Sequence, residues 1–168
     1  MKHVLFILIC LVFAFNSFSQ KIFVVRHAEK ATAEPNMSSD VALSEKGKQR
    51  AEALREVLAD EKIQVIYSTN TIRTRSTAQP LAEKLGLEIK TYGPRPDSAF
   101  IASVLALGKN VLIVGHSNTV DDVVNLIVGD KPVEGDLGES IYDNLYEITI
   151  KDKKTKLEKK KYGASVAN

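Results

Sequence analysis

Short, continuous apolar runs recur along the chain and are separated by stretches in which apolar residues return every three or four positions. Continuous runs lie at residues 22–25 and 111–114, and two further predicted strands, at 63–67 and 87–91, are apolar stretches that Gln64, Glu88 and Lys90 interrupt. Uninterrupted runs of this length are typical of strands that are buried on both faces of a parallel sheet. The intervening periodicity predicts helices that cover those faces.

Helix boundaries follow from capping residues. Ser44 precedes a run whose apolar face ends near residue 58, and Asn70 or Thr71 precedes one that Gly86 ends. Two further helices are predicted, over residues 99–107 behind Asp97 or Ser98, and from Asn118 or Thr119 to residue 128.

Residues 145–150 and 155–162 are predicted to form a hairpin. Alternating strands and helices with short links indicate an α/β fold, a three-layer α/β/α sandwich with a mostly parallel central sheet and a C-terminal hairpin. The length of 168 residues fits one domain. We place it at residues 20–168.

The first nineteen residues have the pattern of a signal peptide. Lys2 and His3 precede an apolar run over residues 4–15, and Ser17 and Ser19 occupy the small-residue positions of a cleavage site. The run is shorter than the ~20 apolar residues of a membrane-spanning helix, so we expect export to the periplasm or medium without stable membrane insertion. An uncleaved anchor is the alternative.

The net charge and the distribution of lysines limit the kinds of partner that we predict. The formal net charge is +2, which provides no overall field to attract nucleic acid, and we predict no nucleic-acid partner. Seven lysines lie between residues 151 and 161. They are more simply explained as protection of an exposed strand edge than as an anion-binding patch.

Cationic side chains follow three of the predicted strands. Arg26 and His27 come directly after the first strand, Arg73 opens the helix after the second, and His116 follows the strand at 111–114. The carboxyl ends of parallel strands meet at one edge of a sheet, where such folds bind ligands. The pattern therefore predicts a cradle for a phosphoryl group.

These residues lie in motifs that resemble the histidine phosphatase superfamily, the phosphoglycerate-mutase-like proteins. The motifs are Arg26-His27, a block from Tyr67-Ser68 through Arg73 to Thr77-Ala78, Gly115-His116-Ser117, and Leu43-Ser44-x-x-Gly47. The resemblance covers residues 21 to the 120s. Ala28 stands at the usual glycine, and Lys30 and Ala33 replace a small hydroxyl residue and an asparagine, so the chain is nearer to the short phosphatase branch than to the mutases.

The resemblance implies that His27 is the nucleophile and that Arg26, Arg73 and His116 are catalytic and bind the phosphoryl oxygens. A neutral imidazole avoids anion–anion repulsion, provided that a carbonyl group fixes its second nitrogen. His116, if protonated, would add a third donor. Ser68 and Asn118 are expected to bind substrate. Arg75 competes with Arg73 for the cradle, and the spacing from Tyr67-Ser68 in the family block favours Arg73. No metal or cofactor is required.

The proton donor to the leaving group is less well defined. We choose Asp97, which follows the third strand, although it would serve equally well as a helix N-cap. Glu29, Asp121 and Asp122 are the alternatives. The loops at residues 31–41 and 92–98 are expected to select the substrate.

Together these features predict an exported, metal-independent phosphatase, resembling histidine acid phosphatases, that hydrolyses a phosphomonoester or phosphoanhydride through a phosphohistidine on His27. The substrate is a small phosphorylated molecule or a phosphoprotein. A non-catalytic phospho-ligand-binding module of the same fold is the alternative. A mutase, whose intermediate must be shielded from water, is less favoured in so short a chain.

Overall fold

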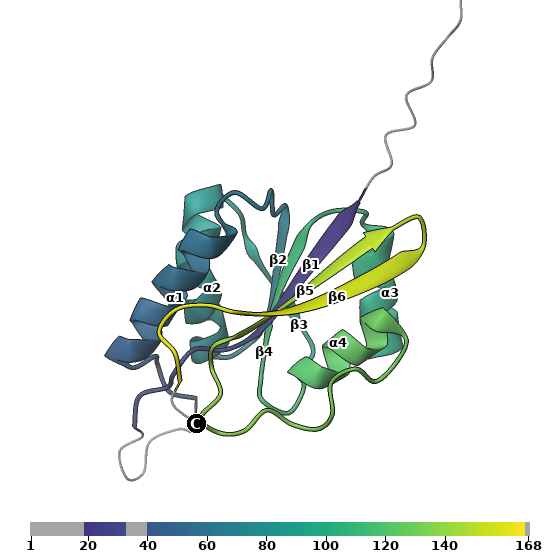
Figure 1. Ribbon diagram of the computed structural model, residues 1–168. Helices are drawn as coiled ribbons and strands as arrows, with labels where there is room; N and C mark the ends of the chain where they lie inside the picture. Colours follow the sequence, from purple (N-terminus) through teal and green to yellow (C-terminus); the bar gives the residue numbers. More distant parts are fainter. Residues whose placement is uncertain (1–18, 33–39, 167–168) are drawn as a thin grey trace, which may run out of the picture.

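The computed structural model of the chain describes residues 19–32 and 40–166, which form a sheet between two layers of helices (Figure 1). The predicted signal peptide, apart from Ser19, and residues 33–39 of the predicted loop lie outside the described residues. The elements in chain order are β1 (Gln20–Arg26), α1 (Glu45–Leu58), β2 (Val65–Thr69), α2 (Ile72–Leu85), β3 (Ile89–Tyr92), α3 (Ser98–Ala106), β4 (Val111–Gly115), α4 (Val120–Val128), β5 (Asn144–Lys151) and β6 (Lys154–Lys161). Among the helices of these residues, none has the length and apolar content needed to cross a membrane.

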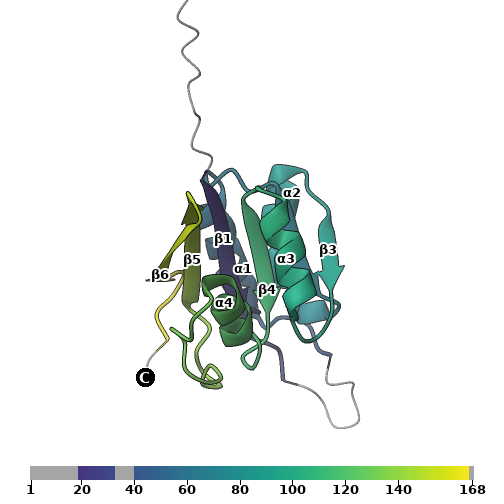
Figure 2. The same cartoon turned by 90° about the vertical axis from the view of Figure 1, so that its right-hand side faces the viewer.

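The six strands lie in the order β3-β2-β4-β1-β5-β6. Figure 2 shows β6, β5, β1, β4 and β3 from the side of α3 and α4. Strands β3, β2, β4 and β1 are parallel, whereas β5 runs antiparallel to β1 and β6 antiparallel to β5. The predicted three-layer sandwich with a C-terminal hairpin is therefore confirmed. The lysine-rich β6 is an edge strand, as expected for charged residues that protect a sheet edge.

The core consists of two layers, one on each face of the sheet. Along β1, Ile22 and Val24 pack on the side of α3 and α4, and Phe23 and Val25 pack on the side of α1 and α2. Each of these four side chains is essentially inaccessible to solvent. Burial of one such side chain stabilises a fold by about 1.5–3 kcal/mol. The continuous apolar run is thus explained by burial on both faces.

Capping residues determine where the helices meet the sheet edge. Ser44 caps α1 by accepting from the Gly47 amide, and Thr71 caps α2 by accepting from the Thr74 amide. Gly47 also allows α1 to lie directly against the chain beyond β1, because a Cβ atom at this position would lie 2.1 Å from the carbonyl oxygen of Glu29. The Leu-Ser-x-x-Gly motif is therefore structural, and it holds the segment that follows the first strand.

Candidate active site

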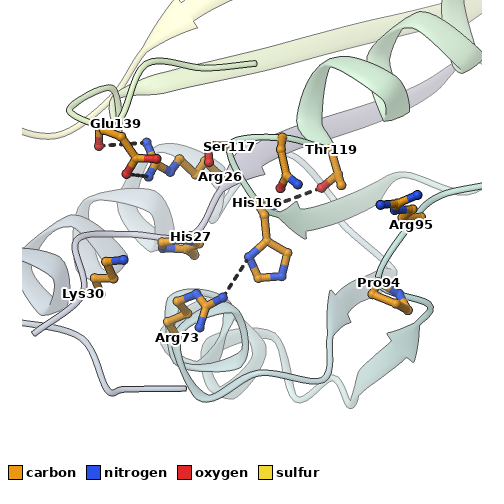
Figure 3. A pocket seen from close by; sticks show the side chains of 11 residues that line it. Arg26, His27, Lys30, Arg73, Pro94, Arg95, His116, Ser117, Thr119 and Glu139 are labelled. Carbon is orange, nitrogen blue, oxygen red and sulfur yellow. Dashed lines mark hydrogen bonds and ion pairs between the residues drawn. The ribbon is translucent and has the colours of Figure 1, made fainter. Parts of the chain in front are cut away.

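The predicted cationic residues meet at the carboxyl ends of three adjacent strands. Because β4 lies between β2 and β1, the residues after these strands share one edge of the sheet. A cavity of about 540 Å³ opens there. Its lining residues are Arg26, His27, Lys30, Arg73, Pro94, Arg95, His116, Ser117, Asn118, Thr119 and Glu139 (Figure 3).

His27 is held by hydrogen bonds to its backbone and to its ring. Its amide donates to the carbonyl of Gly115 at 2.9 Å, which extends the β1–β4 ladder, and the next amide, that of Ala28, donates to Thr77 Oγ1 at 2.9 Å. The ring Nδ1 lies 2.8 Å from the Ala28 carbonyl oxygen. A carbonyl only accepts, so Nδ1 carries the proton and Nε2 has its lone pair available.

The imidazole of His27 is neutral at neutral pH. The side chain is 4% exposed, and burial, with a smaller contribution from the charges of Arg26 and Arg73, lowers its pKa to about 3. Loss of hydration disfavours the charged form of a histidine. His27 therefore has the protonation state that a nucleophile requires.

Arg26 is fixed by the loop that precedes β5. Its Nη1 donates to the carbonyl oxygens of Gly138, Glu139 and Ile141 at 2.9, 3.1 and 3.1 Å. Its guanidinium carbon lies 4.1 Å from the ring centroid of Tyr142. Nε is buried and has no hydrogen-bond partner among the described residues. Arg26 thus lines the cavity and keeps one donor unused within the described part of the chain.

Arg73 and His116 form the opposite wall of the site. Arg73, in the first turn of α2, places Nη2 3.4 Å from His116 Nδ1, while Nη1 lies 3.5 Å from Asp40 Oδ1. His116 Nε2 lies 2.8 Å from Thr69 Oγ1. A guanidinium only donates, so Nδ1 of His116 accepts and Nε2 carries the proton. The two imidazole rings lie edge to face with centroids 5.5 Å apart.

The pKa of His116 is lowered to about 4, first by burial and then by the charges of Arg73 and Arg26. The ring is therefore neutral in the protein without ligand. The protonated third donor predicted from the sequence requires the negative charge of a bound phosphoryl group.

The remaining predicted ligands are divided between cavity and core. Asn118 lines the cavity at the start of α4. Ser68 is completely buried, donates to the carbonyl of Thr69 at 2.8 Å and does not line the cavity. Arg75 lines a different cavity, between α2 and β3, so the arginine of the site is Arg73, as the motif spacing predicts.

None of the four carboxylates considered as proton donor lines the cavity. Asp97 is exposed and accepts from the Phe100 amide at 2.8 Å, so it caps α3. Glu29 is paired with Arg50 through contacts of 2.8 and 2.9 Å. Asp121 is a buried residue of the first turn of α4, and Asp122, in the same turn, is exposed. The role predicted for Asp97 gains no support from its position.

Sequence reasoning missed several residues of the cavity. Lys30 was noted only as a departure from the mutase motif, and Glu139 lies in a stretch predicted only as a loop. Arg95 belongs to the 92–98 loop, which places that loop at the site. Among the described residues, no group of three or more histidine, cysteine, aspartate or glutamate side chains is arranged to hold a metal ion.

The fold and the site define an α/β protein with two histidines and three arginines lining one cavity at the carboxyl ends of its parallel strands. The family model for the histidine phosphatase superfamily, branch 1, matches residues 22–93, which include Arg26, His27 and Arg73. Over these residues the chain is similar to the histidine phosphatase superfamily. Comparison with curated protein sequences gives no match.

Several solved structures share the fold. A mycobacterial glucosyl-3-phosphoglycerate phosphatase superposes with a TM-score of 0.65 at 14% identity, over 88% of this chain and 100% of that one. The protein histidine phosphatase SixA in complex with tungstate gives 0.65 at 17% identity, over 84% and 96%. A protein assigned as the phosphohistidine phosphatase SixA of Agrobacterium tumefaciens gives 0.61 at 19% identity, over 86% and 98%. At these low sequence identities, the structural similarity shows only that the fold is shared.

Proposed function

We propose that this protein is a phosphatase that transfers a phosphoryl group from its substrate to Nε2 of His27 and then to water. The observation that carries the proposal is the bond between His27 Nδ1 and the Ala28 carbonyl. It fixes the tautomer in which Nε2 is nucleophilic, and burial keeps that nitrogen unprotonated.

The surrounding cations suit the transferred group. The phosphoryl group in the transition state carries negative charge on three oxygens, which positioned guanidinium groups stabilise. Arg26 lines the cavity from the end of β1, and Arg73 approaches from α2 on the other side (Figure 3). Both arginines are directed by contacts with the protein, so little reorganisation is needed when the anion binds.

For substrates, we propose a phosphomonoester or phosphoanhydride on a small molecule, or a phosphorylated protein side chain. A cavity of about 540 Å³ is large enough for a small phosphorylated metabolite. Structural neighbours include phosphatases named for phosphohistidine and for glucosyl-3-phosphoglycerate, which supports both classes without choosing between them. Export remains part of the proposal and rests on the pattern of residues 1–19.

The test is hydrolysis of para-nitrophenyl phosphate by the purified protein, with and without a chelator. We expect turnover that the chelator leaves unchanged, that His27→Asn abolishes, and that the control Arg75→Gln, in the other cavity, retains. Equal rates for the parent and the His27→Asn variant would exclude the proposal. Binding of inorganic phosphate without any turnover would instead identify a phospho-ligand-binding module.

A further inference from the structure

The proposed reaction still needs a group that gives a proton to the leaving oxygen. An alkyl alkoxide is a poor leaving group, and a positioned carboxylic acid commonly supplies the proton. Of the carboxylates considered above, Asp97 caps α3, Glu29 is paired with Arg50, and Asp121 and Asp122 lie in the first turn of α4, buried and exposed respectively. None of them reaches the cavity.

Glu139 is the only aspartate or glutamate among the described residues that line the cavity. Its backbone is fixed, because its carbonyl oxygen accepts from Arg26 Nη1 at 3.1 Å and those of Gly138 and Ile141 accept from the same nitrogen. Figure 3 shows its side chain beside Arg26 at the rim of the cavity. The loop thus holds a carboxyl group next to the arginine that would bind the phosphoryl group.

The side chain of Glu139 is much freer than its backbone. Its Oε2 lies 3.7 Å from Arg26 Nη2, and the side chain is 88% exposed. An ion pair this long and this exposed stabilises a fold very little. A carboxylate whose backbone is anchored and whose side chain can turn is suited to follow the oxygen that leaves.

We propose that Glu139 is the general acid and base of the reaction. As His27 Nε2 forms its bond to phosphorus and the bond from phosphorus to the ester oxygen breaks, the carboxylic acid of Glu139 gives its proton to that oxygen, and the alcohol departs. In the second half, the Glu139 carboxylate takes a proton from the water that attacks phosphorus. The N–P bond breaks, which returns phosphate, neutral His27 and protonated Glu139.

This inference rests on the proposed phosphatase function and is tested by the dependence on the leaving group. The full-length protein, Glu139→Gln and Glu134→Gln are compared with para-nitrophenyl phosphate and glycerol 2-phosphate. Glu134 is the matched control, because it is an exposed glutamate of the same loop that does not line the cavity. We expect Glu139→Gln to lower kcat/KM, which reports the transfer to His27, about 100-fold or more for the alkyl ester and much less for the aryl ester, whose leaving group needs no proton.

Equal losses of kcat/KM for the two esters, or no loss for either, would overturn the role of Glu139 while leaving the phosphatase proposal intact. A parent protein that hydrolyses neither ester overturns both proposals. Thermal unfolding of each variant is followed in parallel, and partial rescue of alkyl ester hydrolysis by Glu139→Asp is expected if the carboxyl group itself is required.

Discussion

Lowering the pH from about 7.5 to about 5.5 is expected to leave the imidazole of His27 neutral. An ordinary histidine, with a pKa near 6.5, is protonated about ten to one at the lower value. Burial lowers the pKa of His27 to about 3, so this ring stays almost wholly unprotonated. The imidazole resonances in two-dimensional NMR, assigned by their absence in His27→Asn, should not titrate in this range. A midpoint near 6.5 would refute the account of the nucleophile.

The same pKa shift predicts a change in stability, and its sign follows from proton uptake. The unfolded chain binds a proton at this histidine below about pH 6.5, whereas the folded protein does so only near pH 3, so acid favours the unfolded state in between. The contribution of His27 between about pH 7.5 and 5.5 is a loss of about 1.4 kcal/mol.

Urea unfolding of the parent and of His27→Asn at the two pH values isolates this contribution. We expect the parent to lose about 1.4 kcal/mol more than the variant over the interval. His116, whose pKa is also lowered, titrates in the same direction in both proteins and cancels in the comparison. Identical losses in the two proteins would show that the histidine is hydrated in the fold.

Three substitutions test the contacts that hold the residues of the site in place. Arg50→Met leaves the buried carboxylate of Glu29 without its partner and should lower the free energy of urea unfolding by about 3–5 kcal/mol. Adding Glu29→Gln should restore much of this loss. A loss below about 1 kcal/mol would contradict the prediction. Gly47→Ala forces a Cβ atom against the Glu29 carbonyl and should lower both the melting temperature and kcat, so an unchanged kcat would argue against a tight fit. Tyr142→Ala should raise KM for para-nitrophenyl phosphate roughly 2- to 30-fold, the equivalent of 0.5–2 kcal/mol of cation–π contact with Arg26. Tyr142→Phe, which removes only the 3.4 Å contact between the hydroxyl and Arg26 Nη2, should raise KM less, and equal effects would exclude the cation–π contact.

The parts of the fold that depend on local pattern could be predicted from the sequence. Burial of β1 on both faces produces an uninterrupted apolar run, and Ser44 and Gly86 mark helix ends through their own backbone chemistry. The meeting of Arg26, His27, Arg73 and His116 follows from the rule that parallel strands end at one edge, together with the family motifs.

Contacts between segments that are far apart in the sequence could not be predicted, because no sequence pattern marks the residues that make them. The carbonyl groups that hold Arg26 lie more than 100 residues away, in a loop whose backbone gives no periodic signal. The same loop brings Glu139 to the cavity. Asp97 follows a strand just as the site residues do, but its side chain is used to cap α3, and only coordinates distinguish the two roles.

The central claim is that Nε2 of His27 receives the phosphoryl group. Its direct test is rapid alkaline quenching of the protein during turnover of para-nitrophenyl phosphate, followed by mass spectrometry of the peptides and NMR of the phosphohistidine isomer. We predict a single phosphorylated residue, His27, modified at Nε2, because Nδ1 is bonded to the Ala28 carbonyl. A phosphoryl group on Nδ1, on His116 or on no histidine would contradict the account.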